Sequence, residues 1–200
     1  MRLVMDDLSS SERYKLLTGT VVPRPIGWIS TVDQDGTFNL APFSYFMVAA
    51  TNPPTLAFSG GHHDSGPKDS VRNAIRAGQF VANVADRGLL EAMNASSVDA
   101  PPHVDEFAHA GLEPVASDRV AAPRVAAAPV AFECELTHQL SIGSNTLVFG
   151  RVLVAHLRDG LRGEDGRIDV RALDPVARLA GTQYAALGDI VELARPAWEE

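Results

Sequence analysis

The chain of 200 residues contains a single cysteine, Cys134, and this scarcity excludes a disulfide within the chain. A protein without disulfides is typical of a reducing compartment, so we expect a cytoplasmic location. The first eleven residues carry acidic side chains and serines rather than a basic end and an apolar run, so they predict no signal peptide. No apolar stretch approaches the roughly 20 residues that a membrane-spanning helix needs, so we expect no membrane association.

Positive charge is also scarce, because the formal net charge is −8 and lysine occurs only at Lys15 and Lys68. Such a balance argues against nucleic acid as a partner, since that partner requires a broad basic surface. It leaves room for one local basic pocket. The glycine-rich fingerprint of Rossmann nucleotide sites is absent, and so are Gly-x-Ser-x-Gly and His-Glu-x-x-His. We therefore expect neither a Rossmann fold nor hydrolytic machinery of these kinds.

What the chain does contain indicates an ordinary globular protein, with 46% hydrophobic and 21% charged residues and a length that favours one domain over 1–200. Short β-branched and aromatic segments between turn signals predict strands at 27–32, 44–50, 55–59, 80–84, 130–140 and 147–157. Short helices are predicted at 8–17, 70–77, 89–95 and 174–179, with a polar loop at 60–67. This pattern predicts a mainly β fold, an antiparallel barrel or sandwich with a few short flanking helices.

The first predicted hairpin carries the most informative segment. Gly27–Val32 is followed by a turn and then by Asn39–Ser44, which contains Pro42 where a strand would normally continue. Proline lacks an N–H, so it belongs at a sheet edge, a bulge or a strand end, and we expect the hairpin to break there. The exposed backbone, with the Asn39 amide, small Ala41 and the Ser44 hydroxyl, suits a flat ring with a polar edge, which we interpret as a flavin. A hairpin end without a ligand is the alternative.

A second candidate element starts at Lys68. Lys68-Asp69-Ser70 opens a predicted helix that also carries Arg72 and Arg76. A helix start offers unpaired N–H groups and partial positive charge, which suit a phosphate, and Lys68 and the Ser70 hydroxyl add donors. Asp69 or Ser70 is expected to cap the helix and Gly78 to end it. A capped surface helix with solvated arginines is the alternative.

Arg24-Pro25-Ile26 precedes the first strand of the hairpin. The planar guanidinium of an arginine matches a phosphate or a carboxylate, and the proline fixes the direction in which the chain enters the strand. The segment is therefore a further candidate for anion binding. A surface arginine beside a rigid turn is the alternative.

Two polar clusters could suggest a metal, His62-His63-Asp64 and the group His103, Asp105, Glu106 and His109. Adjacent histidines on an extended segment point apart, so we favour solvated or structural roles for the first cluster. The second lies in the long segment 96–128, for which solvation or substrate contact is favoured over a metal. A segment of this length without a sustained pattern is typical of a functional lid or of a partner-wrapping or disordered excursion.

The predicted strand 130–140 alternates apolar and polar residues. Cys134 lies on its apolar face and is interpreted as a small core residue. Glu133 and Glu135 lie on the opposite, polar face.

In order along nearly the whole chain, these motifs resemble the flavin reductase-like, FMN-binding split-barrel family, in particular its flavoredoxin-like branch. The resemblance rests on Arg24–Thr31, Asp35-Gly36, Asn39–Ser44, Asn52–Pro54, Lys68–Ser70, Phe80–Asn83, Met93–Ser96, Val104–Phe107, Ala110–Leu112, Pro129–Glu135, Arg178–Gly181 and Tyr184.

The resemblance implies a homodimeric, antiparallel split β-barrel that holds FMN without a covalent bond near the dimer interface. It places Ser30, Thr31, Lys68, Asp69 and Ser70 near the phosphate and ribityl chain. It also implies that the rest of the cofactor site is formed by Asn39, Ala41, Pro42, Phe43 and Ser44 along the ring, by Arg24, Pro25, Ile26 and Gly27 as flanks, and by Arg178 and Tyr184 from either subunit.

The function that follows is an NAD(P)H-dependent flavin reductase, in which hydride passes from the nicotinamide to bound or free flavin and then to a second acceptor, such as the flavin of a partner oxygenase. The flavin supplies the redox chemistry, so the absence of a catalytic triad agrees with this reading. The segment 96–128 would gate access to the ring. The alternatives are an FMN-containing electron carrier without nicotinamide turnover and a cofactor-free binding or assembly module.

Overall fold

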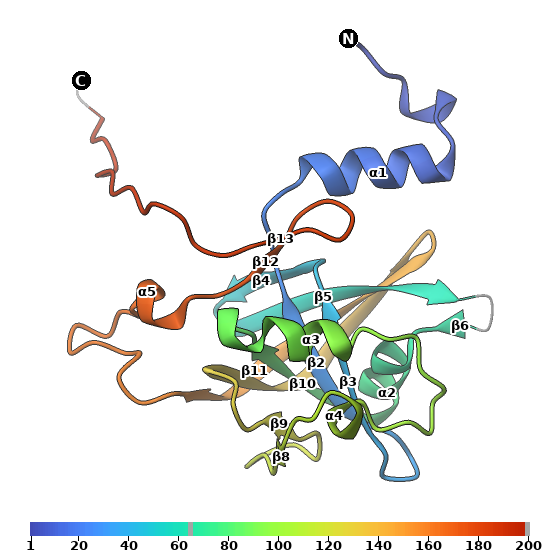
Figure 1. The fold of residues 1–200 in the computed structure, drawn as a ribbon, viewed down its shortest axis with the longest axis vertical. Coiled ribbons are helices and arrows are strands. Elements are labelled where there is room, and N and C mark those ends of the chain that lie inside the picture. The colour runs from blue at the N-terminus through green and yellow to red at the C-terminus, as the bar shows by residue number, and fades with distance from the viewer. Residues whose placement is uncertain (64–65, 199–200) are drawn as a thin grey trace.

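The computed structural model describes residues 1–63 and 66–198, which form a curled antiparallel sheet with short helices around it (Figure 1). Seven strands are hydrogen-bonded in the order β3-β2-β7-β10-β11-β5-β4, and β6 pairs with β5. Their bounds are β2 (Gly27–Val32), β3 (Phe38–Phe43), β4 (Phe46–Thr51), β5 (Pro54–His63), β6 (Gly66–Pro67), β7 (Gln79–Val84), β10 (Val130–Ile142) and β11 (Asn145–Leu157). This arrangement confirms the predicted mainly β, antiparallel class.

The smaller elements lie around this sheet (Figure 1). The short strands are β1 (Arg24–Pro25), β12 (Ala177–Arg178) and β13 (Tyr184–Ala185), which form one sheet, and β8 (Pro114–Val115) and β9 (Arg124–Val125), which form another. The helices are η1 (Met5–Asp7), α1 (Ser10–Thr20), α2 (Asp69–Ala77), η2 (Arg87–Leu89), α3 (Leu90–Ala95), α4 (Glu106–His109) and α5 (Val170–Leu173). Among the described helices, none has both the length and the apolar character needed to cross a bilayer.

The inside of the curled sheet is an aromatic core. Phe43 on β3 packs against Phe58 on β5 with ring centroids 5.0 Å apart, and Phe58 packs against Phe80 on β7 at 5.1 Å. Strands that lie far apart in the order of the sheet therefore meet inside it. Val71 of α2 belongs to the same core, and it packs so closely on Gly60 that a side chain there would overlap it.

A second core lies on the other face of β2 and β3 and joins the sheet to the segment 96–128. Trp28 and Leu40 pack there with Met93 of α3 and Phe107 of α4, all of them fully buried. The Trp28 indole N–H donates a hydrogen bond of 2.9 Å to the Ser96 hydroxyl. The middle of the long segment is thus part of the folded core rather than a free excursion.

The predicted break of the first hairpin is wrong. Strand β3 stays paired with β2 as far as Phe43, and Pro42 lies opposite Trp28 within the ladder. Because β3 is at the edge of the sheet, alternate residues direct their backbone groups away from β2. The Leu40 N–H does so, since it donates to a side chain of α4, and Pro42 lies two residues further on the same side. Its missing N–H therefore costs no ladder bond.

Several predicted boundaries also need correction. Helix α1 covers Ser10–Thr20 rather than 8–17, with Ser9 as its N-cap and Glu12 completing a capping box. The N-cap of α2 is Lys68, so neither Asp69 nor Ser70 caps that helix. Gly78 ends α2 in the left-handed conformation, as predicted.

The predicted helix at 174–179 is wrong, because Asp174 ends α5 and residues 177–178 pair with Arg24 and Pro25. The predicted loop from residue 60 instead continues β5 to His63, since Gly60 and Gly61 pair with β11. Asp64 lies outside the described residues.

Candidate functional site

Two adjoining cavities lie at the edge strand β3. The first, of about 680 Å³, is bounded by β3, the start of α2 and residues 97–102. The second, of about 420 Å³, is bounded by the end of β3, helix α1 and the closing segment 178–184. Pro42, Phe43, Lys68 and Ser97 line both cavities, so the two share a wall. Volumes of this size are typical of sites for small molecules and cofactors.

Most of the residues predicted for the site border these cavities. The first is lined by Asn39, Ala41, Pro42, Phe43, Lys68, Asp69 and Ser70. The second is lined by Arg24, Ile26, Pro42, Phe43, Ser44, Lys68, Arg178 and Tyr184. Segments that are far apart in the sequence thus converge on one region, which is the arrangement that the resemblance implies.

Pro25, Gly27, Ser30 and Thr31 border neither cavity. Gly27 lies against Phe46, where a Cβ would overlap the ring, so packing explains this glycine. Ser30 is fully buried and donates to the Pro123 carbonyl, while Thr31 donates to the Asn39 amide oxygen at 3.1 Å. Pro25 pairs with Ala177 in the small sheet. In the structure these four residues support the walls of the site from behind.

A buried polar network forms one side of the first cavity. The Asn39 oxygen Oδ1 accepts a hydrogen bond of 2.7 Å from the Ser70 hydroxyl, and its Nδ2 donates to both carboxylate oxygens of Glu106 at 3.1 Å. Glu106 is only 5% exposed, and this burial raises the pKa of its carboxyl above the usual value, with Asp69 adding a smaller contribution. The sequence predicted solvation or substrate contact for Glu106 rather than burial, because an acid at the start of a short helix gives no periodic signal of burial.

Arg24 is more buried, and makes more hydrogen bonds within the chain, than its sequence context suggested. It is 8% exposed, and it donates to the carbonyls of Thr18, Val21 and Leu179 and weakly to the Ser44 hydroxyl. Four of its five N–H groups are therefore used within the chain. Its guanidinium connects α1 to the closing segment and leaves its charge beside the second cavity.

Arg178 and Tyr184 form the outer wall of the second cavity. The Arg178 guanidinium lies over the Tyr184 ring, 4.5 Å from its centroid, and donates to its hydroxyl. The Tyr184 hydroxyl in turn donates to the Asn94 amide oxygen at 2.9 Å, so the closing segment is attached to α3.

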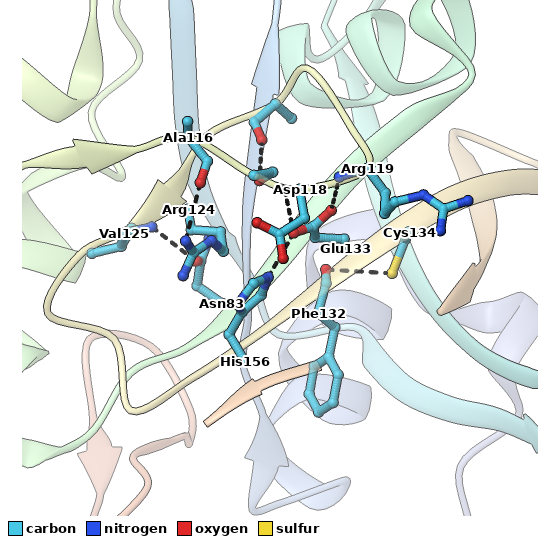
Figure 2. A network of polar contacts seen from close by, with 12 residues as sticks. Asn83, Ala116, Asp118, Arg119, Arg124, Val125, Phe132, Glu133, Cys134 and His156 are labelled. Carbon is cyan, nitrogen blue, oxygen red and sulfur yellow. Dashed lines mark hydrogen bonds and ion pairs between the residues drawn. The ribbon is translucent and has the colours of Figure 1, made fainter. Parts of the chain in front are cut away.

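The metal cluster considered at residues 103–109 does not form, because Asp105 caps α4 and Glu106 binds Asn39. In the described part of the chain, the group with the spacing of metal ligands is instead Asp118, Glu133 and His156 (Figure 2). Glu133 is fully buried there, and it accepts hydrogen bonds from the backbone N–H groups of Asp118 and Arg119 and from His156 Nε2 at 2.8, 2.7 and 2.6 Å.

These contacts make Glu133 a structural anchor, and they show that residues 118–119 cover the face of β10 that the alternation assigned as polar. Burial alone would raise the pKa of its carboxyl, but the hydrogen bonds from Asp118, His156 and Arg119 outweigh burial and lower it. The alternation along β10 was interpreted as one polar face because the sequence does not show that residues 118–119 fold back over it (Figure 2).

The site has the features that a flavin requires. Pro42 and the edge of β3 provide an apolar wall beside polar groups, and Lys68 stands as a cation at the start of α2. In the described part of the chain, Lys68 takes part in no ion pair, so its charge is available to a phosphate. An antiparallel barrel with such a site at its edge defines the class of flavin-binding split barrels.

Comparison with known proteins gives the same result. The family described as flavin reductase like domain matches residues 18–174, and the chain belongs to this family. An uncharacterized protein of Halalkalibacterium halodurans, BH2278, is 39% identical over 203 residues, which cover 98% of this chain and 97% of that protein.

Two solved structures are similar over almost their full lengths. Nitrilotriacetate monooxygenase component B from Bacillus cereus has a TM-score of 0.94 and 35% identity, covering 96% of this chain and 98% of that one. The 2-nitrobenzoate 2-nitroreductase NbaA of Pseudomonas fluorescens has a TM-score of 0.90 and 30% identity, covering 98% and 96%. At 20% identity, a Shewanella frigidimarina protein with a split barrel domain shares the fold with a TM-score of 0.86, which confirms the predicted architecture.

Proposed function

We propose that this protein is an FMN-binding oxidoreductase, specifically an NAD(P)H-dependent flavin reductase that delivers electrons to a second acceptor. The observation that carries the proposal is the pair of cavities that share the wall of Pro42, Phe43 and Lys68. FMN carries a flat ring at one end and a phosphate at the other, and two adjoining spaces that share the cation Lys68 can accommodate both parts. Family membership supports the flavin as the group bound there.

In this proposal the residues of the two cavities divide the cofactor between them. Lys68 and the start of α2 hold the phosphate, and β3 from Asn39 to Ser44 lies along the ring. Arg24, Ile26, Arg178 and Tyr184 close the far side. Bound FMN supplies the hydride-accepting chemistry, and the protein supplies binding, orientation and exclusion of water.

We further propose a homodimer formed through β4. The strand is at one end of the sheet, and its residues after Phe46 are exposed, including Met47 at 49% and Val48 at 67%. Met47 of β4 also lines a largely apolar hollow of about 530 Å³, together with Leu17 and Val21. An exposed apolar edge strand promotes association with another chain, so we propose that β4 is buried against a second copy of this protein.

An oxygenase is the proposed consumer of the reduced flavin. The support is the 35% identity to a protein described as component B of a monooxygenase, over 96% of this chain. A protein of that kind works together with another component, and the same arrangement here would make the reduced flavin a product passed onward.

An absorbance spectrum of the purified protein, followed by titration with NADH and NADPH without air, tests this function. We expect the spectrum of bound flavin and its loss on addition of one or both nicotinamides. A yellow protein that neither nicotinamide bleaches would indicate an electron carrier instead. A colourless protein that does not take up added FMN would contradict the flavin site altogether.

A further inference from the structure

We propose that Glu106 is a positioning residue that fixes the orientation of the Asn39 side-chain amide in the wall of the first cavity. The proposal assigns a role in the site to α4, which belongs to the long segment 96–128. Its consequence for the cofactor rests on the proposed function, whereas the contact between Glu106 and Asn39 stands independently of any ligand.

The carboxylate reaches two consecutive residues of the edge strand. Glu106 Oε2 accepts from the Leu40 backbone N–H at 3.1 Å, and both of its oxygens lie 3.1 Å from Asn39 Nδ2. The Leu40 N–H points away from β2, so without Glu106 it would be a buried donor lacking a partner. One buried carboxylate thus satisfies the backbone of β3 and holds a side chain of the same strand.

The other end of the Asn39 amide is fixed as well. Its oxygen accepts from the Ser70 hydroxyl at 2.7 Å and from the Thr31 hydroxyl at 3.1 Å. A flipped amide would place its oxygen against the carboxylate and its NH₂ group against two hydroxyl donors. Only one of the two orientations therefore satisfies all the groups around it.

This orientation determines what the wall offers to a ligand. Because both carboxylate oxygens lie 3.1 Å from Nδ2, one N–H can serve both of them, and the second N–H is then available to the cavity that Asn39 lines. The Ser70 hydroxyl has already donated its hydrogen to Asn39, so Ser70 can only accept. The wall therefore presents a donor at Asn39 and an acceptor at Ser70, matching a ligand with a carbonyl or ring nitrogen near the first and a hydroxyl near the second.

The test is the variant Glu106→Gln, which keeps the shape of the side chain but offers one acceptor oxygen in place of two. Oε2 accepts from both Leu40 N–H and Asn39 Nδ2, whereas Oε1 accepts from Asn39 alone, so the new NH₂ group faces Asn39 Nδ2 in either orientation of the glutamine. We expect FMN to bind about tenfold more weakly, in line with the loss of one hydrogen bond between the misoriented Asn39 amide and the ligand. We also expect the side-chain amide signals of Asn39 to move in the NMR spectrum of the FMN-free protein.

The matched control is Glu135→Gln, because Glu135 is an exposed carboxylate on β10 that pairs with Arg151. We expect it to leave both the FMN affinity and the Asn39 signals unchanged. If Glu106→Gln fails to fold, hydrogen exchange in the wild-type protein replaces it. The Leu40 N–H should exchange slowly despite its place on an edge strand, and fast exchange would overturn the contact.

The outcomes separate this proposal from the function on which it builds. Unmoved Asn39 signals in Glu106→Gln would overturn the positioning role, and moved signals with unchanged FMN affinity would overturn its consequence for the cofactor. Wild-type protein that binds no FMN would contradict the proposed function, and the NMR comparison then decides the contact between Glu106 and Asn39 by itself.

Discussion

At the scale of single residues, Lys68 occupies an unusual position, since it is one of two lysines and lines both cavities at the start of a helix. A charged hydrogen bond to a phosphate contributes on the order of 1.5–3 kcal/mol, so Lys68→Ala should weaken FMN binding roughly ten- to a hundredfold. Lys15→Ala is the control, because Lys15 is exposed on α1. Equal FMN affinities of the two variants in a fluorescence titration would remove Lys68 from the site.

Cys134 offers a test of the barrel core at the same scale. Its thiol is fully buried, and burial, with a smaller contribution from Glu133, raises its pKa to about 12. Because the thiolate is the reactive form, iodoacetamide at mildly alkaline pH should not modify the native protein and should modify it fully in denaturant. Modification of the folded protein at the rate of a free thiol would mean that the core is open at β10.

Which single residues could be predicted depended on what lies around them. Cys134 was assigned to the core because its own strand shows the alternation. Glu106 and Glu133 were missed as buried groups because distant segments bury them. For Glu106 the partner is Asn39, 67 positions away, and for Glu133 it is the backbone of residues 118–119, which folds back over the sheet. Local patterns carry no information about such contacts.

At the scale of elements, the anchor at Glu133 determines where the segment before β9 lies. Glu133→Gln keeps the size of the side chain but removes the charge and one acceptor for the N–H groups of Asp118 and Arg119. We expect it to lower the free energy of unfolding by about 2 kcal/mol at neutral pH. The control is Glu135→Gln, at an exposed position two residues further along β10. It should change the free energy of unfolding by less than about 0.5 kcal/mol.

The effect of Glu133 should depend on pH in one direction. Its pKa in the folded protein is lower than the ordinary value of 4.5, so the folded state binds this proton less readily than the unfolded chain does. Its stabilisation is therefore present above about 4.5 and is lost as the pH falls through the lower folded value. Denaturant titrations of wild-type protein and Glu133→Gln should converge in acid, and a difference that grows in acid would contradict this assignment.

Elements with complete local signals were predicted well. The strand Gly27–Val32 has the bounds that the sequence indicated, and Gly78 ends α2 as expected. The hairpin break at Pro42 was wrong because the sequence does not reveal which side of β3 faces the neighbouring strand. The helix at 174–179 was wrong because pairing with Arg24 and Pro25 outweighed a local capping pattern.

At the scale of the whole molecule, the exposed edge strand β4 carries the prediction of a dimer. Val48 is 67% exposed on that strand, and an aspartate there would bury a charge in the proposed interface. Light scattering should give twice the monomer mass for wild-type protein and the monomer mass for Val48→Asp. The control Val170→Asp, at an exposed valine at the start of α5, should remain dimeric. A monomeric wild-type protein or a dimeric Val48→Asp would contradict the interface.

The walls of the candidate site come from the first hairpin, the start of α2, the segment after α3 and the closing segment, which the curled sheet brings together (Figure 1). The family resemblance predicted most of these segments, because each motif can be read from a short stretch of sequence. Their contact in space depends on the fold and cannot be read in that way. The polar support behind the walls came only from the structure.

A crystal structure of the protein grown with FMN tests the central claim most directly. The account predicts electron density for the flavin ring along β3 between Asn39 and Ser44, with the phosphate at Lys68 and the start of α2. Clear density for FMN elsewhere on the molecule, or none at saturating FMN with both cavities filled by solvent alone, would contradict it.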